Sequence, residues 1–515
     1  MNWFDDSDLH KEIGRKSFRG LSFTLSAQFL KFFVNLGGTA VLARVLTPGD
    51  FGLVAMLISV TGVAFVINDL GLSTAIVQRP KLTHSEVNCL FWITVAAGLV
   101  TALTVAWTGP LFAIFLKDTR LKAISPLLAL TFLFSSLGSP HRALLRRHMC
   151  FGVLGAIELI SGLGSYLIAI WLAFVGAGYW ALVLQQVIMA LFIALASWVF
   201  CSWRPGRPAW EPTAITLIGF GGNLTGSNLL NYACRNIDNI LIGRFCGSVP
   251  LGLYSKAYQL LLLPIWQINT PMMAAITPAL SRLQFDLPRF KQLFLKSVTG
   301  IALVGMPVVV FMFVRAEGLI RVALGPGWTE AVPIFRLLAP AAFIDTFNIA
   351  GGLLLTPLGR SGRQFRLSAI SAVVIILAFS IGIYWGVAGV AISFSLVTCA
   401  MRAPALMYCC ATTPIRFADL LEVLWRPAFC SIAAGSLLCL CFGEPKLDRA
   451  LYITLFLGRD FLIFLGFFSL AWIVVPGGWS SIRAATTFLL TFGSQRPLHL
   501  GGSTPTERSS PDPKI

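Results

Sequence analysis

A lysine and two amides share one face of the first apolar segment of this 515-residue chain. The segment spans residues 20–43, and Lys31 stands near its middle, with Gln28 three positions before it and Asn35 four positions after it. This spacing places the three side chains on one face of a helix. A charge near the centre of a membrane span costs at least about 2.5–3.5 kcal/mol, so this face is expected to line a wet cavity.

An alternative for Lys31 is that its side chain extends to the membrane surface. Lys31 lies about eleven residues from either end of its segment, which is roughly 16 Å of helix rise. That distance is too long for a lysine side chain to cover easily. The cavity wall is therefore the favoured interpretation, and its ammonium and amide groups suit an anion and hydroxyl groups.

The seventh apolar segment, residues 214–243, repeats this pattern more densely. Its stretch GGNLTGSNLLNYACRNIDNI carries polar side chains at three- and four-residue intervals, which form a stripe along one side of a helix. Such a stripe is unfavourable against lipid and is expected to face inward. Its cavity candidates are Asn228, Asn231, Arg235 and Asp238. Whether Arg235 and Asp238 bind a substrate or neutralise each other stays open, because three residues separate them.

Other charges inside apolar segments divide by their depth. Arg336 and Asp345 lie within the tenth segment and are further cavity candidates. Lys256, Glu158 and Lys296 lie near segment ends, so they are expected at the membrane interface. In the last segment, the neighbouring Arg459 and Asp460 are expected to form a local ion pair.

About fourteen apolar segments must position these side chains. The chain is 56% hydrophobic and only 12% charged, whereas a soluble protein carries about a quarter charged residues. Stretches of roughly twenty apolar residues, the length of a membrane-spanning helix, recur from end to end. The chain is therefore predicted to be an all-α polytopic membrane protein. The segments are 20–43, 51–69, 88–115, 123–140, 151–175, 179–203, 214–243, 250–278, 292–314, 329–356, 367–385, 386–408, 418–442 and 450–475.

The net charge of +17 is explained by orientation in the membrane rather than by nucleic-acid binding. With the N-terminus in the cytoplasm, the inner segments hold more than twice as many Lys and Arg residues as the outer segments, as expected for cytoplasmic loops. Residues 1–19 are predicted to form an amphipathic helix on the inner membrane surface. Residues 476–515 are predicted to form a cytoplasmic, partly disordered tail.

One short sequence occurs twice, 200 residues apart. VLARVLTPGDFGLVAM, from Val41, aligns without a gap with LIGRFCGSVPLGLYSK, from Leu241. Six spans separate the copies, so both enter the membrane from the same side, which predicts two parallel lobes. The arginines of both copies lie at the outer boundary and are expected to anchor their helices there. The identical pairs are Arg44 with Arg244, Gly52 with Gly252 and Leu53 with Leu253.

The repeat sets the predicted domain organisation. An N-lobe of six helices covers residues 20–203 and a C-lobe of six helices covers 204–408. Two further helices occupy 409–475, between the C-lobe and the tail.

The sequence shows no arrangement typical of an enzyme. Its five histidines lie in loops, segment ends or the tail, and it has no ATP-binding P-loop motif. The 11 cysteines lie mostly in apolar runs without a C-x-x-C pair, so no metal site is expected. No cofactor is expected either, and an H⁺ or Na⁺ gradient, the membrane potential or the substrate's own gradient must drive any transport.

Two stretches resemble a known family, the Wzx-like flippases of bacterial polysaccharide export. ARVLTPGDFGLVAM with the following DLGLSTAIVQRP (Asp69–Pro80) resembles its N-terminal signature. NIDNILIGRFCGSVPLGLYSKAYQLLLLP (Asn236–Pro264) with TPALSRLQFDLPRF (Thr277–Phe290) resembles its central signature. The similarity, closest to exporters of colanic acid-type exopolysaccharides, covers most of residues 15–300. Beyond residue 300 only the hydropathy agrees.

The resemblance implies a fold, a substrate and partners. It implies two six-helix lobes in the V shape of the multidrug/oligosaccharidyl-lipid/polysaccharide (MOP) exporter superfamily, which includes the MATE transporters, with two extra helices. The implied substrate is an undecaprenyl-diphosphate-linked oligosaccharide in the bacterial inner membrane, and implied partners are membrane lipids and polysaccharide polymerase or co-polymerase machinery. On this basis Lys31 and Arg235 are expected to face each other across the cavity and attract the diphosphate.

Two other functions remain open on the sequence alone. A MATE-like cation or drug antiporter would share the fold, but its cavity should favour acidic side chains. A membrane-embedded polysaccharide polymerase would normally carry a large outer loop with catalytic bases, whereas no outer loop here exceeds about twenty residues.

Overall fold

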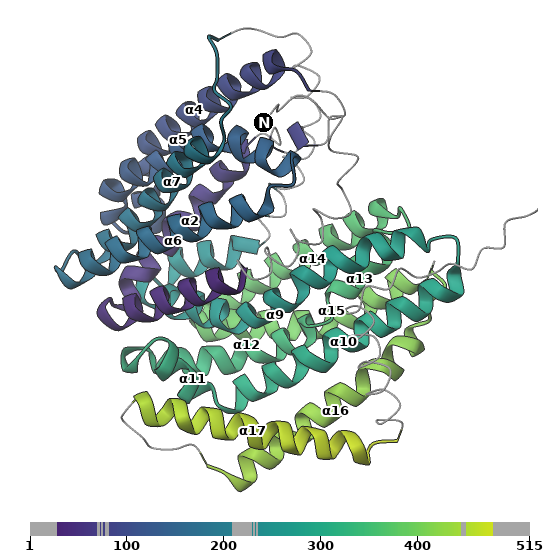
Figure 1. Cartoon of the computed structure of the whole chain (residues 1–515). Coiled ribbons are helices and arrows are strands. Elements are labelled where there is room, and N and C mark those ends of the chain that lie inside the picture. Colours follow the sequence, from purple (N-terminus) through teal and green to yellow (C-terminus); the bar gives the residue numbers. More distant parts are fainter. Residues whose placement is uncertain are drawn as a thin grey trace, which may run out of the picture.

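The computed structural model describes residues 28–69, 73, 76–77, 82–208, 229, 232, 235–411, 413–443 and 450–476. Within these ranges the regular structure is helical (Figure 1), which confirms the predicted all-α class. Asn228, Asn231, the N-terminal residues 1–19 and the tail beyond 476 lie outside the described residues.

The helices fall where the apolar segments predict them. In the described part of the chain, eleven stretches are long and apolar enough to cross a membrane, and one of them, Gly362–Cys410, contains two successive helices. Helical residues 28–45 and 235–245 belong to the first and seventh predicted spans. The other helices are α2 (Pro48–Asp69), α4 (His84–Leu116), α5 (Arg120–Arg147), α6 (Phe151–Phe174), α7 (Tyr179–Phe200), α9 (Ser248–Arg282), α10 (Leu287–Val314), α11 (Ala316–Ala323), α12 (Ala331–Asp345), α13 (Ile349–Leu355), α14 (Ser361–Gly382), α15 (Gly386–Cys410), α16 (Phe417–Cys441) and α17 (Ala450–Val474).

Local capping fixes the ends of α4 and the turn into α5. At the start of α4, Thr83 and Glu86 form a capping box, in which each side chain accepts a hydrogen bond from the other residue's backbone N–H. At its end, Lys117 adopts φ +57°, and the N–H of Asp118 donates to the carbonyl of Ala113. The short turn makes α4 and α5 antiparallel neighbours.

The helices form two groups. Figure 1 shows α4–α7 as one group and α9–α15 as a second, with α16 and α17 on the outer flank of the second group. Helix α2 packs against α4, α5 and α7, and also against α9 of the other group. The interface between the groups is therefore built around α2 and α9, the helices that begin inside the two repeated segments. The predicted domain boundaries themselves stay predictions.

A buried ion pair attaches α17 to the second group. Arg315, between α10 and α11, lies 2.7 Å from the Asp460 carboxylate, and the two side chains are 2% and 0% exposed. Arg315 also donates a hydrogen bond to the carbonyl of Phe442, at the end of α16. The predicted pair of Arg459 and Asp460 is confirmed at 2.9 Å. Asp460 thus holds two arginines, of which the sequence indicated one.

Candidate functional site

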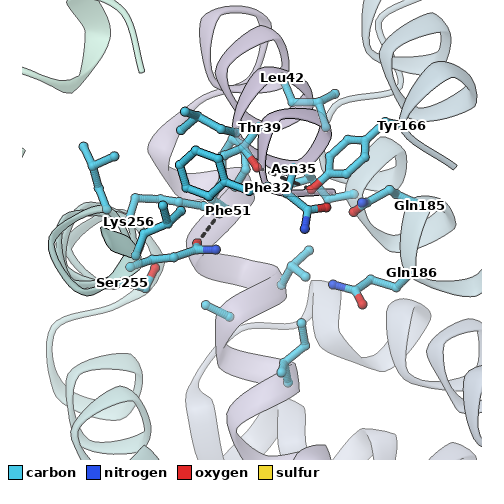
Figure 2. Close-up of a pocket in the computed structure, with 18 of the residues that line it drawn as sticks. Phe32, Asn35, Thr39, Leu42, Phe51, Tyr166, Gln185, Gln186, Ser255 and Lys256 are labelled. Carbon is cyan, nitrogen blue, oxygen red and sulfur yellow. Dashed lines mark hydrogen bonds between the residues drawn. The ribbon is translucent and has the colours of Figure 1, made fainter. Parts of the chain in front are cut away.

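A cavity of about 690 Å³ lies between the two groups of helices. Helix 28–45, α2, α6 and α7 form one side, and helix 235–245, α9 and the end of α11 form the other. Figure 2 shows Gln185 and Gln186 on one side of this space and Ser255 and Lys256 on the opposite side, with Asn35 between them. Of the residues that the structure describes, eight with amide side chains line the cavity: Gln28, Asn35, Gln185, Gln186, Asn236, Asn239, Gln259 and Gln267.

The predicted polar face of the first helix lines this cavity. Gln28, Lys31 and Asn35 all border it, as their spacing suggested. The Lys31 ammonium lies 2.6 Å from the carboxylate of Glu158 on α6, and both side chains are about two-fifths exposed. The sequence predicted Glu158 at the membrane interface, whereas the structure shows it on the wall of the cavity. Helix α6 begins at Phe151, so Glu158 lies roughly two turns inside, where it pairs with Lys31.

Lys256 is a second cavity lysine that the sequence interpretation placed at the interface. It lines the cavity from α9, donates a hydrogen bond to Gln259 at 3.0 Å, and holds its ammonium 4.6 Å from the ring centre of Phe51 on α2. Helix α9 begins at Ser248, so Lys256 lies more than two turns inside. A usable signal was present: polar residues of α9 recur at helical spacing from Ser255 to Thr270 along the cavity.

The seventh helix turns a different set of residues to the cavity than expected. Asn236 and Asn239 line it, whereas Arg235 and Asp238 do not. The Asp238 carboxylate accepts hydrogen bonds from the Tyr254 hydroxyl at 2.9 Å and from a backbone N–H, and it forms no ion pair with Arg235. Because adjacent helical positions point about 100° apart, a rotation by one residue exchanges these pairs. The structure places Lys256, and not Arg235, across the cavity from Lys31.

The two candidates of the tenth span lie away from the cavity. Asp345, at the end of α12, forms an ion pair with Arg402 of α15 at 3.1 Å. Arg402 also donates a hydrogen bond to the side chain of Asn348. Arg336 is half-buried on α12 and does not line the cavity. The pair of Asp345 and Arg402 thus links α12 to α15 within the second helix group.

The cavity can hold a polar group that carries negative charge. Among its described lining residues the charged side chains are Lys31, Lys256 and Glu158, which leaves a positive balance. Amides both donate and accept hydrogen bonds, as sugar hydroxyls require. The prolines at positions 264 and 271 of α9 also leave the carbonyls of Leu260 and Gln267 without a helical donor, and both of these residues line the cavity.

One relative is similar to this chain over most of the length of both proteins. Over 427 aligned residues the chain is 23% identical to the lipopolysaccharide biosynthesis protein WzxC of Escherichia coli (strain K12), covering 81% of this chain and 86% of that protein.

Two solved transporters share the fold. The lipid II flippase MurJ in an inward closed conformation superimposes with a TM-score of 0.70 at 13% identity, over 87% of this chain and 98% of that chain. An inward-facing multidrug resistance MATE family transporter of the MOP superfamily gives a TM-score of 0.58 at 14% identity, over 76% and 96%. The predicted polytopic fold of this superfamily is thereby confirmed.

A family model matches the part of the chain that contains the repeated segments. The profile described as polysaccharide biosynthesis protein matches residues 41–333, which is more than half of the chain and includes both copies of the repeat. The expected resemblance is confirmed, and the chain is a multi-pass membrane protein that belongs to this polysaccharide biosynthesis family.

Proposed function

We propose that this protein carries a lipid-linked oligosaccharide, an undecaprenyl-diphosphate-linked repeat unit, from the cytoplasmic to the periplasmic leaflet of the bacterial inner membrane. The observation that carries the proposal is the amide-lined cavity between the two helix groups, with two lysines against one glutamate. The relatives support it, because WzxC is named for lipopolysaccharide biosynthesis and MurJ as a lipid II flippase.

The lining residues suggest how such a head group is held. Lys31 and Lys256 attract the diphosphate, and charge-assisted hydrogen bonds to phosphate are stronger than neutral ones. The amides bind the sugar hydroxyls, and the prenyl chain stays in the lipid. Glu158 pairs with Lys31 at 2.6 Å, so the arriving phosphate takes the place of this carboxylate.

The setting of the transporter is part of the same proposal. Both termini are cytoplasmic, the cavity faces each side of the membrane in turn, and an H⁺ or Na⁺ gradient or the membrane potential drives the cycle. The protein makes and breaks no covalent bond, so it is not an enzyme. Polymerase or co-polymerase machinery receives the delivered repeat unit.

Exchanging one cavity lysine tests this assignment. Lys256→Gln removes a charge-assisted contact and should lower export of the polysaccharide by about tenfold at unchanged protein abundance. Lys296→Gln is the matched control, because Lys296 is exposed on α10 and does not line the cavity. Export can be measured as surface polysaccharide per cell. Equal export from both variants would contradict the proposal.

A MATE-like antiporter is the second candidate, favoured by the TM-score of 0.58. An exporter of cationic drugs needs acidic groups in its cavity, whereas the two lysines outnumber Glu158 here. Deletion of the gene should therefore stop polysaccharide export and leave drug resistance unchanged. Loss of resistance with normal polysaccharide would favour the antiporter.

A further inference from the structure

The two copies of the repeated segment touch each other through their glycines. A Cβ atom on Gly52 would lie 1.7 Å from the carbonyl oxygen of Ser248, and one on Gly252 would lie 1.8 Å from the carbonyl oxygen of Pro48. Pro48 and Ser248 are themselves equivalent positions of the repeat. Each glycine therefore meets the first residue of the other helix, a reciprocal contact of the kind that a two-fold axis produces.

Hydrogen bonds join the two helix groups around this crossing. The indole N–H of Trp328 donates to the carbonyl of Ala43 at 2.8 Å, and Trp328 is only 1% exposed. The guanidinium of Arg44 donates to the carbonyl of Val322 at 2.7 Å. Arg44 thus links the groups in addition to any anchoring in the membrane.

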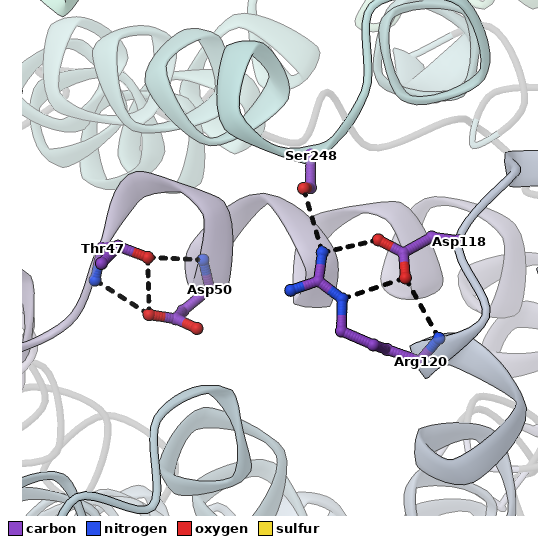
Figure 3. A network of polar contacts seen from close by, with 5 residues as sticks. All are labelled: Thr47, Asp50, Asp118, Arg120 and Ser248. Carbon is purple, nitrogen blue, oxygen red and sulfur yellow. Dashed lines mark hydrogen bonds and ion pairs between the residues drawn. The ribbon is translucent and has the colours of Figure 1, made fainter.

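A third link runs from α5 to the start of α9. Arg120 donates to the hydroxyl of Ser248 at 3.3 Å and forms an ion pair with Asp118 at 2.7 Å (Figure 3). Burial by itself would raise the pKa of the Asp118 carboxyl, but hydrogen bonds from Arg120 outweigh it and keep this pKa below its ordinary value. Asp118 therefore stays ionised and holds Arg120 towards Ser248.

The cavity begins directly beneath the crossing. Phe51, next to Gly52, lines the cavity together with Leu42 and Leu324. The Phe51 ring packs edge-on against Trp328, with ring centres 5.4 Å apart, and it lies under the ammonium of Lys256. The contacts at the crossing thus close one end of the cavity. This end carries the turns that precede α2, α5 and α9, which the distribution of Lys and Arg along the chain predicts to lie on the outer side.

We propose that the two repeated segments form a gate at the outer end of the cavity, closed in this structure and opened by separating α2 from α9 at the glycine crossing. Because the copies are equivalent, the two sides of the gate are self-complementary. The glycine of each lobe packs against the first residue of the other lobe's helix. That this gate faces the outside of the cell rests on the proposed function, whereas the contacts that close it are seen in the structure. The proposal also explains why these two stretches resemble each other.

A disulfide across the crossing tests whether it must open. A Cβ on Gly49 would lie 3.2 Å from a methyl carbon of Val249, so Gly49→Cys with Val249→Cys places two thiols within bonding reach. The matched control is Gly138→Cys with Ala194→Cys, whose Cβ atoms would be 3.6 Å apart within the first helix group. Each disulfide is quantified by mass spectrometry of unreduced digests, and each single cysteine variant receives the same oxidant.

The expected result is loss of polysaccharide export when residues 49 and 249 are crosslinked, recovery after reduction, and unchanged export from the control crosslink. Recovery on reduction also shows that the variant folds. If the fully crosslinked protein exports polysaccharide as fast as the same protein after reduction of the disulfide, the proposal is overturned. The crossing would then be a fixed contact that need not open.

A second measurement does not depend on polysaccharide. Ser255 lines the cavity. In a Ser255→Cys variant, labelling of the cysteine by a membrane-impermeant maleimide added from outside reports whether the outer end of the cavity is open. Adding Gly252→Ala, whose methyl group cannot fit against Pro48, should raise this labelling about tenfold. Gly300→Ala, at a helical glycine with open space around it, should leave labelling unchanged. Unchanged labelling with Gly252→Ala would overturn the proposed gate, even if the proposed substrate is correct. Increased labelling without any change in polysaccharide export would overturn only the proposed substrate.

Discussion

The same two helices, α2 and α9, meet in opposite ways along their length. Near their first turns they approach until only glycine fits, with Gly52 and Gly252 each touching the opposite backbone. Beside Gly52, the Phe51 ring faces Lys256, which lies one turn beyond Gly252, and further along both helices contribute to a cavity of about 690 Å³. The crossing has no room for a side chain at either glycine, whereas amide and lysine side chains line the cavity.

Under the proposed gate and the proposed function, this difference means that closure and recognition are separate tasks. Shape carries the closure, because a methyl group at either glycine would overlap a carbonyl oxygen. In the proposed function, charge and hydrogen bonding carry the recognition, through Lys31, Lys256 and the amides that line the cavity. Substitutions at the two regions should therefore fail in different ways, one by holding the outer end open and the other by weakening the hold on the substrate.

The largest effect is expected at the crossing. Gly52→Ala should destabilise the closed state by about 1–3 kcal/mol, as overpacking of a tight contact does, and should lower export about tenfold or more at normal abundance. Because the contact is reciprocal, Gly252→Ala should give the same loss. Export per protein molecule, measured for both variants, checks this, and a clear difference between them would break the two-fold description.

A smaller effect, with a distinctive rescue, is expected at the ion pair in the cavity. Lys31→Gln removes a cation and leaves the Glu158 carboxylate without this partner, so it should weaken export about tenfold. The double variant Lys31→Gln with Glu158→Gln removes the repelling carboxylate as well. It should therefore export more than Lys31→Gln alone.

The measurement is a double-mutant cycle on export at matched abundance. Additive effects of the two substitutions would show that Lys31 and Glu158 do not act on the same ligand, and would separate the pair from recognition.

The next effect, on stability alone, is expected far from both regions. Asp460→Asn leaves the buried guanidinium of Arg315 without its full counter-charge and should lower the free energy of unfolding by about 3 kcal/mol. Thermal unfolding in detergent measures this loss. Export per folded molecule should stay near the wild-type level, and a strong loss of export from fully folded protein would assign α17 a part in transport.

The smallest effect is expected at Gly300 of α10. A Cβ there would meet nothing within 4 Å, so Gly300→Ala should only reduce the freedom of the unfolded chain and raise the unfolding free energy by about 0.5–1 kcal/mol. A slightly higher melting temperature with unchanged export would show that the crossing glycines matter through contact and not through helix flexibility. A loss of export here would remove that distinction.

The fold followed from the sequence because lipid imposes one rule on every span. Continuous apolar stretches of helical length predicted the helices, and the polar spacing of Lys31, Gln28 and Asn35 predicted the face that borders the cavity. A charge in the middle of a span has few acceptable environments, so its position is informative even without a structure.

Depth and rotation could not be predicted in the same way. Glu158 and Lys256 seemed interfacial because the ends of a span are uncertain by several residues, and two turns of helix decide between lipid surface and cavity. The polar stripe of the seventh helix is too wide to fix which residues face inward, so Asn236 and Asn239 take the place expected for Arg235 and Asp238. The repeat was visible, but its reciprocal glycine contact exists only in three dimensions.

The central claim is that the cavity between the lobes carries a lipid-linked oligosaccharide across the membrane. Purified protein in vesicles that contain an undecaprenyl-diphosphate-linked repeat unit tests it, with a membrane-impermeant glycosidase reporting how fast the glycan reaches the outer leaflet. The account predicts rapid transfer with the wild-type protein and about tenfold slower transfer with Lys256→Gln. Transfer no faster than in protein-free vesicles, or equal transfer with the two proteins, would contradict it.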